Sequence, residues 1–168
     1  MRAAVARYSA AMQLFVIRHG IAEEAEPGQP DAERVLTKDG KKKLKAVVRG
    51  MRAAGWKLDR VITSPWRRAM QTAAALAKRD PIVTDLLTCS PRSDLLPLLN
   101  HPGETIGVVG HEPWLGELVS WLVFGDTRHG DVFELKKSAV ALLDGEAVPG
   151  GMTLQGLVPP RIMRAVRR

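Results

Sequence analysis

The feature that most constrains the fold is a short apolar run, residues 14–17, that leads directly into Arg18, His19 and Gly20. Four consecutive Leu, Phe, Val and Ile side chains are typical of a strand that is buried on both faces of a sheet. Arg18 and His19 then fall where the strand ends and a loop begins. In open α/β sheets, ligands bind at the carboxyl ends of the strands. We therefore predict that this strand brings a permanent cation and a titratable nucleophile into a crevice, where Gly20 allows close approach of its backbone N–H to a ligand.

Patterns typical of helices follow this strand. Thr37 is a favourable N-cap for a helix that ends near Gly55, and the apolar residues of this helix fall on one face. After a second short strand at 60–63, Ser64 as N-cap and Pro65 as first helical residue predict another helix. This alternation of strand and helix is typical of a parallel sheet whose connections are helices.

The second half of the chain repeats the alternation and then departs from it. Residues 105–110 form a strand-like run that ends in His111, and Pro113 begins an amphipathic helix. Residues 138–143 and 152–158 then predict a hairpin-like pair around a Gly-rich turn. The sequence therefore predicts an α/β fold, a three-layer α/β/α sandwich with a mainly parallel central sheet and at least one antiparallel strand.

The length of 168 residues is consistent with one domain. We predict that residues 1–13 form a flexible N-terminal extension and that residues 14–168 form the single domain. No apolar run approaches the roughly 18 residues of a membrane span, so no membrane partner is expected. The single cysteine, Cys89, cannot form an internal disulfide, which favours a reducing, cytoplasmic compartment.

The charge of the chain favours anionic partners. It has 25 Lys and Arg against 18 Asp and Glu, a formal net charge of +7. Basic residues are scattered and aromatic residues make up only 5% of the chain, so the composition does not favour nucleic acid. We expect the lysines at 41–43 and the arginines of the C-terminal tail to form solvated faces.

Three strand ends carry residues that could bind a phosphate. Besides Arg18 and His19, these are Ser64, with Arg68 a turn into the following helix, and His111. A helix N-terminus presents free N–H groups and a positive dipole to an anion, and arginines bind phosphoryl oxygens through paired hydrogen bonds. The sequence therefore predicts a phosphate site at the carboxyl edge of the sheet.

Taken together, these motifs resemble those of the histidine phosphatase superfamily. They are Arg18-His19-Gly20, Leu36-Thr37 with Gly40, Ser64-Pro65-x-x-Arg68-Ala69-x-Gln71-Thr72, and Gly110-His111. The short length and the Leu87-Thr88-Cys89 segment before a helix look like the SixA-type phosphohistidine phosphatase branch. The resemblance extends from about residue 13 to residue 158 and implies the histidine phosphatase fold.

The resemblance implies a role for each residue. His19 would be the nucleophile and would carry a transient phosphohistidine, while Arg18, Arg68 and His111 would bind the phosphoryl oxygens. Gly20 and Ser64 are further candidate phosphate contacts. Because cationic side chains supply the electrostatics, the reaction would be metal-independent, and we expect no metal and no cofactor. The general acid has two candidates, Glu112 and Glu23.

The ease with which the leaving group departs indicates the class of substrate. Imidazole leaves far more readily than a sugar alkoxide, so a site with a weak acid or none can still cleave a P–N bond. This favours hydrolysis of phosphohistidine on a protein such as a phosphotransfer domain. A phosphatase of small phosphomonoesters and a non-catalytic phosphate-binding module are the alternative hypotheses.

Overall fold

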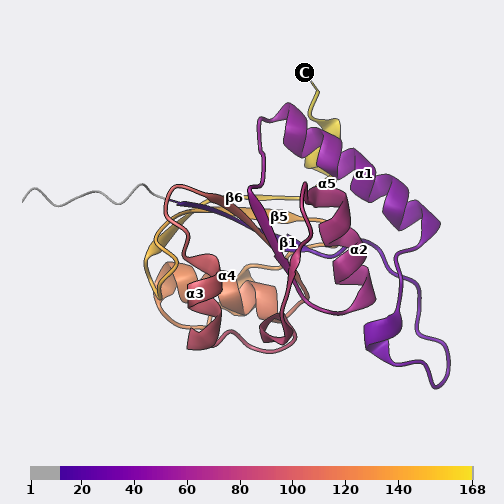
Figure 1. The fold of residues 1–168 in the computed structure, drawn as a ribbon, viewed down its shortest axis with the longest axis horizontal. Coiled ribbons are helices and arrows are strands. Elements are labelled where there is room, and N and C mark those ends of the chain that lie inside the picture. Colours follow the sequence, from indigo (N-terminus) through magenta and orange to yellow (C-terminus); the bar gives the residue numbers. More distant parts are fainter. Residues whose placement is uncertain (1–11, 168) are drawn as a thin grey trace, which may run out of the picture.

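The central sheet has the strand order β3-β2-β4-β1-β5-β6 within residues 12–167, the part of the chain that this computed structural model describes (Figure 1). Its strands are, in chain order, β1 (Met12–Arg18), β2 (Arg60–Thr63), β3 (Ile82–Val83), β4 (Thr105–Gly110), β5 (Val140–Gly145) and β6 (Met152–Val158). The first four are parallel, whereas β5 pairs antiparallel with both β1 and β6. The predicted mainly parallel sheet with an antiparallel end is confirmed.

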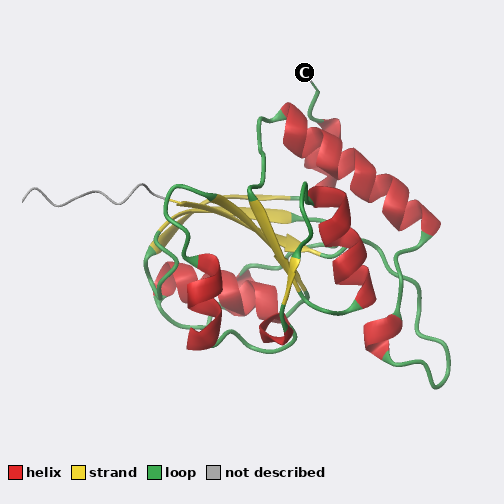
Figure 2. Ribbon diagram, viewed as in Figure 1, coloured by secondary structure: helices red, strands yellow, loops and turns green. Residues whose placement is uncertain are grey.

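Helices cover both faces of this sheet (Figure 2). They are α1 (Lys38–Ala53), α2 (Arg67–Leu76), α3 (Leu96–Leu99), α4 (Trp114–Phe124) and α5 (Pro160–Ala165). Helices α1, α2 and α5 share one buried apolar cluster, and α3 and α4 contribute to a second cluster on the opposite face. The predicted three-layer α/β/α sandwich is confirmed. No helix between residues 12 and 167 is both long enough and apolar enough to cross a membrane.

Strand β1 is buried on both of its faces, as its composition predicts. Leu14 and Val16 belong to the core under α3 and α4, while Phe15 and Ile17 belong to the core under α1 and α2. This division follows from the two-residue period of a strand, which points successive side chains to opposite faces. The strand therefore holds its last residue, Arg18, and the two that follow it at a fixed position between its neighbours β4 and β5.

Helix α1 begins and ends where the sequence predicts. The Thr37 side chain accepts a hydrogen bond from the Gly40 N–H at 2.8 Å, and Gly55 adopts a positive φ directly after the helix. Helix α5 was not predicted. It packs on α1 so closely that a Cβ at Gly50 would overlap the carbonyl oxygen of Met163.

Two predicted boundaries are wrong. Helix α2 begins at Arg67 with Trp66 as its N-cap, not at Pro65 with Ser64 as N-cap. The buried Ser64 hydroxyl accepts a hydrogen bond from the Trp66 N–H in a tight turn that precedes the helix, so Arg68 is the second helical residue.

The second wrong boundary is that of the N-terminal extension. Met12 and Gln13 belong to β1, because the Met12 side chain is buried in the core and its backbone pairs with Gly145. The rest of the predicted extension, residues 1–11, lies outside the described residues.

Candidate active site

Three neighbouring parallel strands end side by side. Strand β4 lies between β1 and β2, and the register aligns Arg18 with Gly110. The next residues along these strands are therefore His19, His111 and, from β2, Ser64. The two imidazole rings lie 5.1 Å apart between centroids, and the structure thus brings together the strand-end residues that the sequence singled out.

The environment of His19 fixes which ring nitrogen carries the proton. Nδ1 lies 2.7 Å from the carbonyl oxygen of Gly20, which can only accept, so Nδ1 carries the proton and donates. Nε2 accepts a hydrogen bond from Nε of Arg68 at 3.2 Å. Burial lowers the pKa of His19 to about 4, and the nearby Arg68 and Arg18 guanidinium groups act in the same direction. At neutral pH the ring is therefore uncharged, and the one lone pair of Nε2 accepts the hydrogen bond from Arg68.

Arg68 is buried against the nucleophile and held from its other side by Asp31. Its two terminal nitrogens donate to the Asp31 carbonyl oxygen at 2.5 Å and to Asp31 Oδ2 at 2.6 Å. The guanidinium also stacks over the Trp66 ring at 4.6 Å. With the bond to His19, three of the five N–H donors are occupied, and two remain for an oxyanion.

His111 and Ser64 form a buried pair. His111 Nε2 lies 2.8 Å from the Ser64 hydroxyl, which already accepts from the Trp66 N–H. If the hydroxyl donates to Nε2, then Nδ1 carries a proton, and this atom has no partner among the described residues. Burial lowers the pKa of His111 to about 3, and the neighbouring His19 ring acts in the same direction. In this tautomer, His111 is a neutral ring whose Nδ1–H is available to an oxyanion.

Arg18 supplies another available donor. One terminal nitrogen of its guanidinium donates to the carbonyl oxygen of Leu135 at 2.7 Å, which anchors the side chain to the segment before β5. Its Nε atom is buried without a partner among residues 12–167. A buried N–H without a partner is costly, so an anion that accepts from it would bind favourably.

These side chains line one pocket of about 350 Å³. Its lining residues are Arg18, His19, Asp31, Arg34, Trp66, Arg68, His111, Glu112, Trp114 and Lys137. Four of them are cationic and two are acidic, so the pocket favours an anion. Within residues 12–167, no group of three His, Cys, Asp or Glu side chains is arranged to hold a metal ion.

Sequence reasoning missed several of these lining residues, above all Asp31 and Arg34. Asp31 bridges the two arginines, because its Oδ1 accepts from Arg34 and its Oδ2 accepts from Arg68, both at 2.6 Å. The hydrogen bond from Arg34, together with that from Arg68, lowers the pKa of the Asp31 carboxyl. The available signal was the loop after Gly20, which is rich in acidic residues and leads back to a helix N-cap.

Two predicted residues lie away from the oxyanion position. The Gly20 N–H donates to the Thr72 hydroxyl at 3.0 Å, so it is not available to a phosphate. Glu23 is exposed and does not line the pocket, and its carbonyl oxygen accepts from Arg34. The structure therefore does not bring Gly20 N–H or the Glu23 carboxyl to the nucleophile.

Glu112 does line the pocket, but both of its carboxylate oxygens accept backbone hydrogen bonds. Oε1 accepts from the Leu135 N–H at 2.7 Å and Oε2 from the Gly116 N–H at 3.1 Å. The side chain thereby joins the first turn of α4 to the segment that anchors Arg18. To donate a proton, Glu112 would have to give up one of these bonds.

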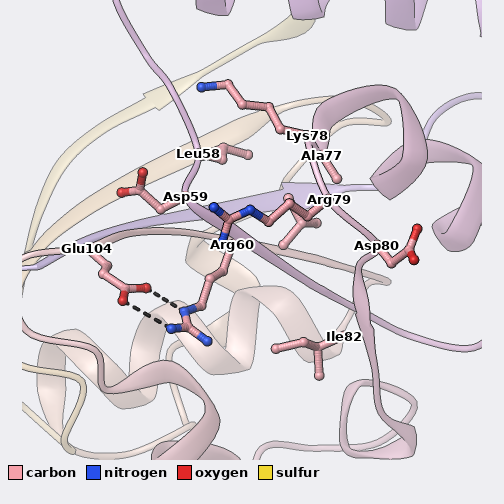
Figure 3. A pocket seen from close by; sticks show the side chains of 10 residues that line it. Leu58, Asp59, Arg60, Ala77, Lys78, Arg79, Asp80, Ile82 and Glu104 are labelled. Atoms are coloured by element: carbon pink, nitrogen blue, oxygen red, sulfur yellow. Dashed lines mark hydrogen bonds and ion pairs between the residues drawn. The ribbon is translucent and has the colours of Figure 1, made fainter.

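A larger cleft of about 620 Å³ lies at the opposite, amino-terminal ends of β2 and β4 (Figure 3). Arg60 and Glu104 face each other across it in a two-point ion pair. It contains none of the residues at the carboxyl ends of the strands.

The comparisons with known proteins agree with this geometry. Residues 14–88 match the sequence model of the histidine phosphatase superfamily (branch 1). An uncharacterised protein of Picosynechococcus sp. is 33% identical over 138 residues, which make up 77% of this chain and 82% of that protein. This chain belongs to the histidine phosphatase superfamily. His111 of this histidine phosphatase lies beyond the matched stretch, and the fold returns it to the site.

Solved phosphatases share the architecture of most of the chain. The protein histidine phosphatase SixA in complex with tungstate has a TM-score of 0.75 and 26% identity, over 90% of this chain and 99% of SixA. A mutant phosphoserine phosphatase from Entamoeba histolytica in complex with phosphoserine has a TM-score of 0.66 at 17% identity, over 89% and 98%. This histidine phosphatase is thus of the SixA type, as the sequence predicts, and the fold it shares also occurs in a phosphatase of another substrate.

Proposed function

We propose that this histidine phosphatase hydrolyses phosphohistidine on a protein through a covalent intermediate on His19. The observation that carries the proposal is the environment of His19: a neutral imidazole with its proton held on Nδ1 by Gly20 and its Nε2 beside Arg68. A neutral imidazole is a nucleophile at pH 7 without help from a separate base. Arg18, Arg68 and His111 surround the place where the phosphoryl oxygens would lie.

In the first step, the Nε2 lone pair of His19 gives up its hydrogen bond from Arg68 and attacks phosphorus, and the P–N bond to the substrate imidazole breaks. The electron pair of that bond goes to the substrate nitrogen. If the other ring nitrogen of the substrate is protonated, the leaving group is a neutral imidazole and no proton moves. The remaining N–H donors of Arg18 and Arg68 and the Nδ1–H of His111 would stabilise the charge on the equatorial oxygens.

In the second step, water attacks phosphorus, loses a proton to solvent, and the P–Nε2 bond breaks with its electron pair returning to Nε2. In this step, as in the first, the Nδ1–H of His19 donates a hydrogen bond to the Gly20 carbonyl oxygen. Because it keeps the proton on Nδ1, the phosphorylated ring departs as a neutral imidazole. His19 is thereby restored to the form that attacks the next substrate.

The carboxylates of the pocket favour this substrate over a phosphate ester. An ester leaves as an alkoxide and requires a proton donor, whereas the Asp31 carboxyl has a lowered pKa and both Glu112 oxygens accept backbone bonds. Similarity to SixA, described as a protein histidine phosphatase, supports the same substrate class. Binding of tungstate by SixA is consistent with a pocket for a tetrahedral oxyanion. The single cysteine is consistent with a cytoplasmic location, which we include in the proposal.

The test is phosphate release from a histidine-phosphorylated phosphotransfer domain, with p-nitrophenyl phosphate and phosphoserine as competing esters. We expect His19→Ala to lower turnover about 10³-fold or more, because it removes the atom that bonds to phosphorus. His101→Ala, at the opposite end of the sheet, is the matched control and should keep wild-type turnover. Acid-labile phosphate should be trapped on wild type and not on His19→Ala.

Two results would overturn the proposal. Undiminished hydrolysis by His19→Ala would exclude this residue as the nucleophile. Faster, saturable turnover of a small ester than of the phosphoprotein would instead indicate a small-molecule phosphatase, with the same fold and site.

A further inference from the structure

Helix α1 carries most of the excess positive charge of the chain. Its 16 residues include seven Lys or Arg side chains and a single carboxylate, Asp39. The formal net charge of all 168 residues is +7. The net excess is therefore concentrated on this helix, because the 18 Lys and Arg residues outside it are nearly balanced by 17 Asp and Glu.

Five of these cations lie on one face of the helix. They are Lys38, Lys41, Lys42, Lys45 and Arg49, all exposed. At 100° per residue they fall within a stripe about 100° wide, and at 1.5 Å per residue they span about 16 Å. Arg164 of α5, more than a hundred residues later, joins them along a shallow groove of about 570 Å³. We call this surface the basic groove.

The basic groove is not neutralised by the protein itself. Among residues 12–167, the ion pair made by α1 is the one between Lys43 and Asp39, at 2.6 Å. Neighbouring like charges three or four residues apart destabilise a helix. An anionic partner bound along the stripe would relieve that repulsion.

The basic groove begins close to the active site. Thr37, the N-cap of α1, donates its N–H to the carbonyl oxygen of Ile21, two residues beyond His19. Arg34 lines the active-site pocket and Lys38 lines the groove, and four residues of chain separate their Cα atoms by at most about 14 Å. A protein seated on the groove could therefore present a side chain to His19.

We propose that the basic groove docks an acidic face of the protein that carries the substrate phosphohistidine, an inference that rests on the function proposed above. Opposite charges across such a surface raise the rate of encounter and orient the partner. A protein partner is favoured over nucleic acid because the described residues that line the groove include no aromatic side chain on which bases could stack.

The test compares two double charge reversals that change net charge equally. Lys41→Glu with Lys42→Glu alters the basic groove, and Lys78→Glu with Arg79→Glu alters the exposed cleft at the opposite end of the sheet (Figure 3). The first variant should fold, because a glutamate at position 41 can pair with Lys45 one turn later. The substrates are a histidine-phosphorylated carrier domain with an acidic surface and a phosphohistidine peptide without acidic residues.

We expect the groove variant to lose about tenfold or more in kcat/KM on the carrier at low salt and to keep wild-type kcat/KM on the peptide. The cleft variant should stay within about twofold of wild type on both substrates. Added salt should slow the wild type on the carrier and narrow its advantage over the groove variant. In a His19→Ala background, the groove reversal should raise the Kd for the phosphorylated carrier about tenfold, and the cleft reversal should leave it unchanged.

Other outcomes would overturn the docking proposal. Equal losses in both double variants would indicate an effect of net charge only, and an unchanged carrier Kd would show that the groove is not used. Binding of an RNA oligonucleotide or an anionic vesicle that the groove reversal abolishes, with the carrier Kd unchanged, would assign the groove to another class of partner. If the wild type hydrolyses neither substrate but the groove reversal still weakens carrier binding, the proposed function fails and the docking surface stands.

Discussion

The two hollows at opposite ends of the parallel strands differ in chemistry more than in size. The cleft at the amino ends is the larger, about 620 Å³, against about 350 Å³ for the pocket at the carboxyl ends. In the cleft, Arg60 and Glu104 are paired with each other (Figure 3), and an exposed Asp59 carboxylate accepts from the Thr105 N–H.

The pocket holds the opposite arrangement. His19, Arg68 and His111 are at most 5% exposed, and N–H donors of Arg18 and His111 are buried without a partner among the described residues. Buried donors act on an anion through a lower effective dielectric than exposed ones. The comparison teaches that unpaired, buried donors beside a nucleophile identify the site, and that volume does not.

After His19→Ala, the largest effect should come from Arg68→Ala. This change removes two available donors and the group that faces His19 Nε2, so kcat should fall about 10²–10³-fold, or about 2.7–4 kcal/mol. Steady-state phosphate release checks it. Arg67→Ala, the exposed neighbour in the same helical turn, is the control and should leave kcat unchanged. Comparable losses of kcat in both variants would mean that the substitutions disturb helix α2, and that the Arg68 guanidinium has no specific role.

Next in size is the pH dependence of stability, which the pocket histidines should dominate. Their pKa values, about 4 for His19 and about 3 for His111, lie below the value of about 6.5 expected in the unfolded chain. Below pH 6.5 the unfolded chain takes up protons that the folded protein does not, so the free energy of unfolding falls with decreasing pH toward 4. Above pH 6.5 these groups contribute no slope.

The measurement is urea unfolding of wild type and His111→Asn at pH 7 and pH 5. Wild type should lose about 2 kcal/mol more than the variant over this interval, at about 1.4 kcal/mol per pH unit below 6.5. Equal losses would show that His111 is not held neutral by burial.

A smaller effect is expected from Ser64→Ala. The change removes the hydrogen bond that orients His111. The free energy of unfolding should fall by about 1 kcal/mol, and kcat should fall roughly fivefold, which corresponds to a similar energy. Ser120→Ala is the matched control, since Ser120 is also buried and its hydroxyl bonds to the Asp126 carbonyl oxygen and the His129 N–H. It should lose stability without losing turnover. A full-rate Ser64→Ala would mean that His111 is oriented by packing against Trp66 and Trp114 alone.

The smallest effect should be that of Arg60→Ala in the amino-end cleft. The ion pair with Glu104 is exposed on both sides, and pairs of this kind contribute little to stability. Turnover and the melting temperature should both stay within error of wild type. A clear loss of turnover would contradict the distinction between the two hollows, because it would show that the larger cleft also contributes to catalysis.

What the sequence determined by itself was local. The apolar run before Arg18 predicted β1 as a strand buried on both faces, and Thr37 predicted the start of α1, because burial periodicity and N-capping depend on residues within one or two turns. The same signals placed His19 and His111 at the ends of two predicted strands, and the fold made those strands neighbours.

The tertiary structure decided which groups of the site are still available. Gly20 N–H is taken by Thr72, 52 residues away, and the Glu112 carboxylate by Leu135, 23 residues away. Asp31 reaches Arg68 across 37 residues. A hydrogen bond between distant segments leaves no periodic trace in the sequence, because the packing of whole layers brings its partners together. The proposed nucleophile and phosphate-binding side chains could therefore be read from the chain, whereas Asp31, Arg34 and the hydrogen bonds of the site were found only in the fold.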